Sequence, residues 1–107
     1  MFQKDTSSGL TPLIEIEDGL ISQLCVVRYD DQAYPGVIED VDEDSVQVRA
    51  MHSSEANHFY WPMIEDLCWY RKEHVVTLLQ KPMQQLTKRL MKLDDDIWKS
   101  IQHALDI

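Results

Sequence analysis

Histidine and cysteine side chains are the residues of this sequence that could bind a metal ion. The candidate zinc ligands are His52, His58, Cys68 and His74. Zinc sites use paired ligands at short, recognisable spacings, and these residues follow no such pattern. Cys68 also lies inside the apolar run LCWY. We therefore predict no metal site, and we expect the histidines to lie in exposed loops.

The sequence also lacks the patterns of common enzymes. Its three glycines stand far apart, so no glycine-rich loop is available to bind a phosphate. The serine pairs at 7–8 and 53–54, taken with the histidines, show no nucleophile and base at a recognisable spacing. The acidic residues at 65–66 and 94–96 carry oxygens of the kind that bind divalent cations, but solvated turns explain them better. We predict that the protein is not an enzyme and has no cofactor.

The charge of the chain favours a cationic partner. There are 19 acidic and 10 basic side chains, for a formal charge of −9. Residues 14–66 contain 13 acids and two bases, whereas residues 67–99 contain four acids and seven bases. A protein that binds nucleic acid needs a basic surface, so this alternative is open only for the C-terminal region. The basic side chains that could contact nucleic acid there are Arg71, Lys72, Lys81, Lys88, Arg89 and Lys92.

Length and composition indicate one small globular domain. The chain has 107 residues, of which 44% are apolar. No apolar run approaches the roughly 18 residues of a membrane span, and residues 1–10 lack the apolar core of a signal peptide. Cys25 and Cys68 each lie in an apolar run, where a reduced thiol behaves as a small hydrophobic group. We expect buried thiols and an intracellular protein, with a disulfide as the alternative.

Residues 22–80 are predicted to form short antiparallel strands. The clearest period of two is SVQVRAM (45–51), which places Val46 and Val48 inward and Met51 outward. Polar turns separate the runs and are too short for parallel crossovers. The other predicted strands are 24–29, 34–38, 59–61, 67–70 and 75–79.

Strands at this spacing indicate a small barrel. We therefore predict a mainly β fold, with a five-stranded antiparallel barrel at residues 22–80. A flexible segment at residues 1–21 precedes it, and a helical extension at residues 81–107 follows it.

The C-terminal extension has helical periodicity. Leu86, Leu90, Leu93 and Ile97 recur at spacings of four, three and four, which predicts one apolar stripe. We expect one or two helices here, because the acidic residues 94–96 could instead cap a second short helix. The stripe could pack on the barrel, or it could pair with itself or with another protein, because the spacing also suits a short coiled coil. A protein–protein assembly module that uses this helix, with the barrel as its scaffold, is our second functional hypothesis.

Three segments of the predicted barrel share a pattern with a known group of proteins. They are CVVRY (25–29) with the acidic turn after it, YPGVI (34–38) and DEDSVQV (42–48). This pattern resembles the Tudor-like and Agenet-like group of small Src-homology-type barrels, and it covers about half of the chain. The stretch WPMIEDLCWYRKEHVV (61–76) also resembles segments of uncharacterised proteins of the mobile-element type.

The resemblance implies a nuclear chromatin reader that binds methylated lysine or arginine, or a basic peptide, in an aromatic cage. A methylated ammonium group keeps its charge but has lost hydrogen-bond donors. Aromatic faces attract such a cation by roughly 0.5–2 kcal/mol per contact. A neighbouring carboxylate adds attraction and accepts any N–H that remains.

The resemblance also implies which residues build the cage. They are Tyr29 and Tyr34, a carboxylate from Asp30 or Asp31, and a further aromatic wall from Phe59 or Trp61. Tyr29 matches the aromatic residue that ends the first strand, and Tyr34 matches the one that opens the second. The chain departs from the family at residues 49–53, where no aromatic residue follows the third strand. The alternative is that both tyrosines only close the end of the barrel, with their hydroxyls in water.

Overall fold

The computed structural model describes residues 9–105. Its strands are β2 (Leu24–Tyr29), β3 (Gln32–Val41), β4 (Ser45–Ala50), β5 (His52–Glu55), β6 (His58–Tyr60), β7 (Asp66–Arg71), β8 (Val75–Leu78), β9 (Gln84–Gln85) and β10 (Met91–Lys92). Its helices are the 3-10 turns η1 (Asp18–Leu20) and η2 (Lys72–His74) and the α-helix α1 (Asp95–Leu105). The prediction of a mainly β fold with a C-terminal helix is confirmed. Among residues 9–105, no helix is long and apolar enough to cross a membrane.

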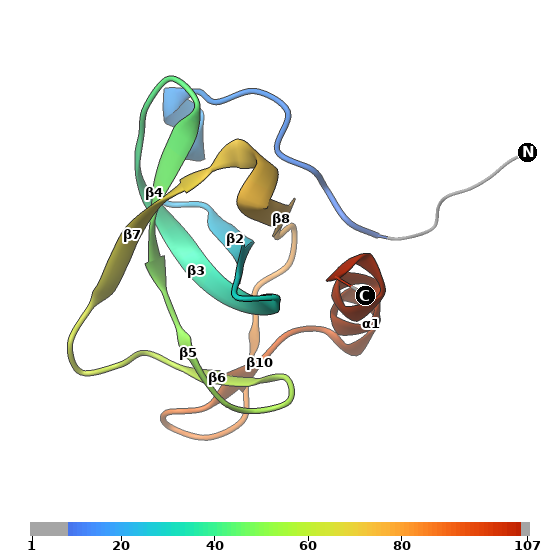
Figure 1. Cartoon of the computed structure of the whole chain (residues 1–107). Helices are drawn as coiled ribbons and strands as arrows, with labels where there is room; N and C mark the ends of the chain where they lie inside the picture. The colour runs from blue at the N-terminus through green and yellow to red at the C-terminus, as the bar shows by residue number, and fades with distance from the viewer. Residues whose placement is uncertain (1–8, 106–107) are drawn as a thin grey trace, which may run out of the picture.

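The strands form two antiparallel sheets (Figure 1). The large sheet has five strands in the order β7-β4-β3-β2-β8, and the small sheet has four in the order β5-β6-β10-β9. The prediction of a five-stranded barrel is wrong in one respect, because the sheet is not closed. Its edge strands β7 and β8 pair with β4 and β2, and not with each other.

One continuous stretch of chain connects the two sheets. β4 ends at Ala50, β5 begins at His52, and only Met51 lies between them. Val46 and Val48 point into the large sheet's core as predicted, but the prediction that Met51 points outward is wrong, since it is 1% exposed. The Met51 N–H still donates to the Pro35 carbonyl at 2.8 Å, and beyond this bond the chain enters the small sheet. The alternation along β4 would leave Met51 facing solvent, but here the small sheet covers it. Met51 is therefore buried in the second core.

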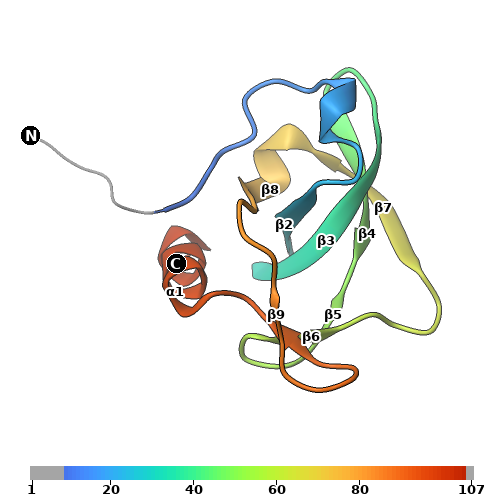
Figure 2. The same ribbon diagram turned by 180° about the vertical axis from the view of Figure 1, so that it is seen from behind.

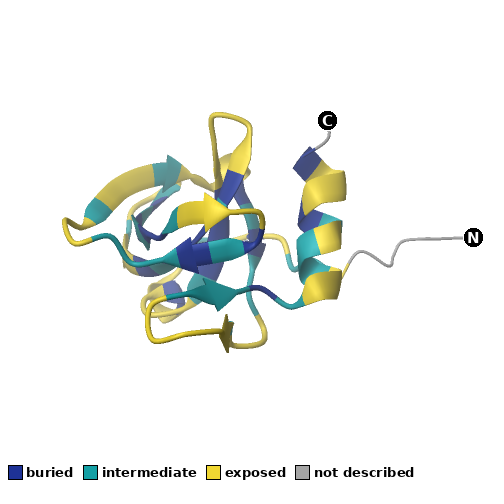
Figure 3. Ribbon diagram, turned by 90° about the horizontal axis from the view of Figure 1, so that it is seen from below, coloured by how far each residue is buried: buried dark blue, intermediate teal, exposed yellow. Residues whose placement is uncertain are grey.

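Two hydrophobic cores lie on opposite faces of the large sheet. The buried residues of the first core are Leu13, Leu20, Cys25, Val27, Ile38, Val46, Val48 and Val75. Those of the second core are Val26, Ala33, Met51, Phe59, Leu93, Ile101 and Leu105. Successive side chains of a strand point to opposite faces, so β2 contributes to both cores and is buried on both sides. α1 turns its buried positions toward the second core and its exposed positions away from it (Figure 3).

The N-terminal segment covers the first core. We predicted flexibility for residues 1–21, of which residues 1–8 lie outside the described range. Residues 9–21 run past α1 to the turn between β3 and β4 (Figure 2). Leu13 and Leu20 are buried there, and Thr11 forms an antiparallel bridge with Leu78 of β8. This part of the segment is therefore packed against the sheet.

The predicted helical stripe is divided among several elements. Leu86 and Leu90 lie in the β9–β10 hairpin, where the Leu86 N–H donates to the Leu90 carbonyl at 2.8 Å. Leu93 is 2% exposed in the second core, and of these four residues only Ile97 lies in α1. The prediction that all four lie on one helical stripe is therefore wrong, whereas the alternative of a short helix that begins at the acidic residues 94–96 is confirmed.

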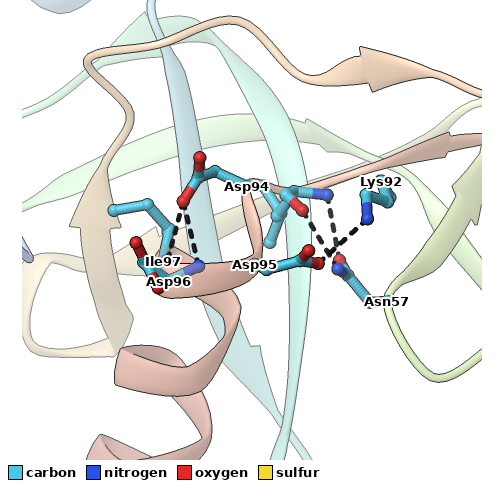
Figure 4. A network of polar contacts seen from close by, with 7 residues as sticks. Asn57, Lys92, Asp94, Asp95, Asp96 and Ile97 are labelled. Carbon is cyan, nitrogen blue, oxygen red and sulfur yellow. Dashed lines mark hydrogen bonds and ion pairs between the residues drawn. The ribbon is translucent and has the colours of Figure 1, made fainter.

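Asp94 explains where the helix begins. Its Oδ1 accepts hydrogen bonds from the N–H groups of Asp96 at 2.9 Å and Ile97 at 3.3 Å (Figure 4). This is the geometry of a helix N-cap, and capping satisfies N–H groups that have no partner in the first turn. The cap at Asp94 thus starts the short helix α1 directly after the β9–β10 hairpin.

Asn57 joins the β5–β6 hairpin to the segment that leads into α1 (Figure 4). Its side chain is buried and donates to the Leu93 carbonyl at 3.0 Å, while the Leu93 N–H donates to Asn57 Oδ1 at 2.9 Å. Its φ of 55° lies in the left-handed region, which asparagine tolerates better than most residues. One side chain therefore stabilises both a tight turn and the docking of the C-terminal segment.

Asn57→Ala should lower the free energy of unfolding by about 2–3 kcal/mol, because it removes two buried hydrogen bonds and places alanine at a positive φ. Urea denaturation measures this loss. Ser53→Ala in the same hairpin is the control, since its hydroxyl bonds only to the exposed Glu55 carbonyl at 3.2 Å. A loss for Asn57→Ala no larger than that of the control would contradict the role of Asn57.

Gly36 permits the close approach of β3 to its neighbouring strand β4, where it pairs with Ala50. A Cβ atom at this position would lie 2.6 Å from Val48 Cγ1 and 2.7 Å from the Arg49 carbonyl oxygen. Gly36→Ala should therefore cost about 2 kcal/mol or more, in the range of overpacking. Gly19→Ala is the matched control, because its Cβ would meet only the mobile carboxylate of Glu17 at 3.1 Å. Equal melting temperatures for the two variants would refute the requirement for glycine at position 36.

Candidate functional site

One hollow of the described part of the chain is lined by all four tyrosines of the sequence. We name it the tyrosine pocket, and its volume is about 510 Å³. Its lining residues are Tyr29, Gln32, Tyr34, Ala50, Met51, His52, Ser53, Tyr60, Asp66, Cys68 and Tyr70. They come from β2, β3, β4, β5, β6 and β7 and from Met51. The pocket therefore lies where the chain passes from one sheet to the other.

The β2–β3 hairpin positions the first two tyrosines. Its turn consists of Asp30 and Asp31, whose φ angles of 53° and 63° give a two-residue hairpin turn that suits the twist of the strands. Tyr29 is 61% exposed at the end of β2, and Tyr34 is half-buried in β3. The Tyr34 hydroxyl donates to Gln32 Oε1 at 3.2 Å, so its ring is held at the mouth of the pocket.

The opposite wall joins the two sheets by a hydrogen bond. His52 Nε2 in β5 lies 3.0 Å from Asp66 Oδ2 in β7. A carboxylate only accepts, so Nε2–H of His52 donates this hydrogen bond. The His52 ring also meets Tyr60 edge to face, with ring centroids 6.0 Å apart. His52 and Tyr60 are direct cross-strand partners, which places Tyr60 in the wall.

Tyr70 closes the pocket on the β7 side. Burial raises the pKa of Tyr70 to about 12, and negative charge on Cys68 and Asp66 acts in the same direction. At neutral pH the phenol therefore keeps its proton. Tyr70, Cys68 and Asp66 alternate along β7, and β7 pairs with β4 so that Tyr70 lies opposite Val46. These three side chains consequently share one face.

The structure separates the predicted cage residues. Of the four aromatic residues, only Tyr29 and Tyr34 line the tyrosine pocket. Phe59 is 1% exposed and packs edge to face on Trp98 in the second core, so the assignment of Phe59 to an open cage is wrong. Trp61 carries the Arg49 guanidinium 4.4 Å from its ring centroid, so one of its faces already meets a cation.

The predicted carboxylates lie beside the pocket and not in its lining. Asp31 forms an ion pair with Arg28 at 2.8 Å. Asp30 lines a neighbouring hollow of about 540 Å³ that shares Tyr29, Cys68 and Tyr70 with the tyrosine pocket. The carboxylate in the lining is that of Asp66.

Sequence reasoning missed Tyr60, Tyr70, His52 and Asp66 as site residues. The alternation of Asp66, Cys68 and Tyr70 was a usable signal, because it puts them on one face of a strand. No local signal reveals the His52–Asp66 pair, since the two residues belong to different sheets.

The two thiols differ in environment. Cys25 is buried as predicted, but the prediction that Cys68 is buried is wrong, because β7 is an edge strand and Cys68 faces the open pocket. Both are free thiols. Among residues 9–105, no group of three or more His, Cys, Asp or Glu side chains is arranged to hold a metal ion.

The titration of Cys25 and Tyr70 predicts a loss of stability at alkaline pH. Burial raises the pKa of the Cys25 thiol from 9.0 to about 12, and the pKa of Tyr70 rises from 10.0 to about 12. The folded state then holds both protons more tightly than the unfolded state. The free energy of unfolding should therefore fall as pH rises from about 9 to about 12.

Urea denaturation of the wild type and of Tyr70→Phe over this pH range measures the effect. The variant removes one of the two titrations and should lose less stability above pH 10. The same pH dependence in both proteins would contradict the buried, protonated state of Tyr70.

Comparisons with known proteins gave no match to a family model, to a curated protein or to a solved structure. The Tudor-like resemblance, and the nuclear location that it implies, therefore stay predictions. The function of the site has to be argued from its own geometry and charge.

Proposed function

We propose that the tyrosine pocket binds the cationic side chain of a protein partner, with methylated lysine or arginine as its preferred ligand. One observation carries the proposal, namely that four tyrosines and the carboxylate of Asp66 line one open pocket. This makes the protein a non-enzymatic binding module, in which the two sheets act as a rigid frame for the pocket.

The chemistry of the lining suits a soft cation. Aromatic rings present negative quadrupole density on their faces, and a methylated ammonium is attracted to several faces at once. A volume of about 510 Å³ is within the ordinary range of ligand pockets, which is roughly 300–1,000 Å³. Phenol hydroxyls and Asp66 supply acceptors for an N–H of a partly methylated ligand.

The charge of the surroundings supports a cation over an anion. Among residues 9–105, the lining includes no lysine or arginine, and the hydrogen bond to Asp66 occupies Nε2–H of His52. The whole chain carries a formal charge of −9. An acidic surface of this kind mainly accelerates the encounter with a basic segment, while the rings provide the contact.

The second hypothesis, assembly through a C-terminal helical stripe, has less support. Of its four residues, Leu93 and Ile97 belong to the second core, and Leu86 and Leu90 lie in a hairpin. α1 directs its apolar face to the body of the protein. Little of the predicted helical surface therefore stays available for a partner.

Isothermal titration with N-acetyl trimethyl-lysine methyl ester tests the proposal. Its neutral analogue, in which carbon replaces the quaternary nitrogen, has the same shape but no charge. We expect the cation to bind at least about fivefold more tightly, because two cation–π contacts at an exposed site contribute about 0.5–1 kcal/mol each. Equal affinities would contradict a cation pocket.

Tyr34→Ala should weaken binding of the cation about fivefold, whereas Tyr34→Phe should stay within about twofold of the wild type, since it keeps the ring face. Leu86→Ala is the control, because Leu86 is exposed at a distant hairpin. Loss of binding in Tyr34→Phe, with the fold intact by circular dichroism, would assign recognition to the hydroxyl and not to the ring.

A further inference from the structure

Strand β7 forms the uncovered edge of the large sheet. Among residues 9–105 it pairs with β4 and with no other strand, and it lies at the rim of the molecule (Figures 1 and 2). The opposite edge differs, because Thr11 bridges Leu78 of β8, and the Leu78 N–H donates to the Thr11 carbonyl at 2.8 Å. An open edge presents alternate N–H and C=O groups to which another strand can bind.

The inner face of β7 belongs to the tyrosine pocket. Asp66, Cys68 and Tyr70 are successive inward residues of the strand, and all three line the pocket. Side chains that stand opposite each other on neighbouring strands have Cβ atoms about 4.5–5.5 Å apart. An inward side chain of a strand added to β7 would therefore enter the mouth of the pocket.

The hollow also continues along the strand. The neighbouring hollow shares Tyr29, Cys68 and Tyr70 with the tyrosine pocket and extends to Arg71 and His74. The length of β7 is thus bordered by a groove and not by a single hole. A groove of this shape fits an extended chain better than an isolated small molecule.

The outer face of β7 exposes two apolar side chains, with Arg71 at the end of the strand. Leu67 is 42% exposed and Trp69 is 49% exposed, and the preceding loop exposes Met63 by 94% and Ile64 by 86%. β7 has no proline or lysine, the residues that commonly protect an edge from pairing. Apolar side chains of an added strand would pack against Leu67 and Trp69.

We propose that an extended basic peptide binds as an additional strand on β7, with cationic side chains facing inward into the tyrosine pocket and apolar side chains facing outward beside Leu67 and Trp69. This inference rests on the proposed function and adds that the partner binds as an extended strand. Charge favours this occupant, since Asp30, Asp31 and Asp66 line the two hollows. The arginines beside them are already in ion pairs, Arg28 with Asp31 and Arg71 with Asp44 and Glu73. A second copy of this chain, with its charge of −9, is the less suitable occupant.

Two ligands distinguish binding in the tyrosine pocket alone from binding that also adds a strand to β7. N-acetyl trimethyl-lysine methyl ester reaches only the pocket. A blocked heptapeptide with valine at odd positions, arginine at positions 2 and 6 and trimethyl-lysine at position 4 reaches both. The heptapeptide should bind at least about fivefold more tightly, because its backbone adds two or more hydrogen bonds to the edge of β7. The amide signals of β7 should shift with the peptide, and those of β8 should not.

A third ligand tests the backbone directly. This ligand is the same heptapeptide with two successive N-methylated residues. Alternate N–H groups of a strand point to the same side, so one of the two lost N–H groups faces β7 in either register. The affinity should therefore fall toward that of N-acetyl trimethyl-lysine methyl ester. Trp69→Ser should weaken binding of the heptapeptide and not of the derivative. Ile14→Ser, at an exposed apolar residue elsewhere, should change neither.

The outcomes distinguish the two proposals. Equal affinity for heptapeptide and derivative, with unshifted β7 amides, would overturn strand addition and leave the cation pocket intact. Failure of both ligands to bind would remove the proposed function and this inference together. A dimer of the free protein in sedimentation that dissociates in Trp69→Ser would assign the edge to a second copy and overturn the peptide.

Discussion

The passage of one chain segment from the large sheet to the small sheet at Met51 is the constraint on which the rest of the structure depends. Met51 keeps its backbone bond to Pro35 while its side chain enters the second core. The sheets therefore meet at a corner and do not close into one barrel. That corner leaves room for the tyrosine pocket, and Ala50, Met51 and His52 from the passage form part of its lining.

Because the sheets meet at this corner, both of them supply side chains to the tyrosine pocket. Tyr29, Tyr34 and Tyr70 come from the large sheet, whereas Tyr60 comes from the small sheet. The hydrogen bond from His52 to Asp66 connects the two at the rim. The lining combines the partly buried phenol of Tyr70 with the carboxylate of Asp66, and this negative charge favours a cation over an anion.

Local patterns predicted much of the large sheet, and long-range pairing explains what they missed. The alternation of Val46 and Val48 predicted β4 correctly because one face of that strand is buried along its whole length. The same alternation failed at Met51, where the neighbouring sheet replaces solvent. The stripe that contains Leu86 and Leu93 has helical spacing, yet the hairpin and the cap at Asp94 decide the structure there. Tyr29 and Tyr34 were found through a short local motif. Tyr60 and Asp66 reach the site only through pairing between distant strands.

Intermolecular nuclear Overhauser effects, measured on protein with labelled tyrosine rings in complex with N-acetyl trimethyl-lysine methyl ester, test this account most directly. The account predicts contacts from the N-methyl protons to Tyr60 and also to Tyr29, Tyr34 or Tyr70, since both sheets supply the walls. Contacts confined to rings of one sheet, or contacts to no tyrosine, would contradict a cation pocket at the corner between the sheets.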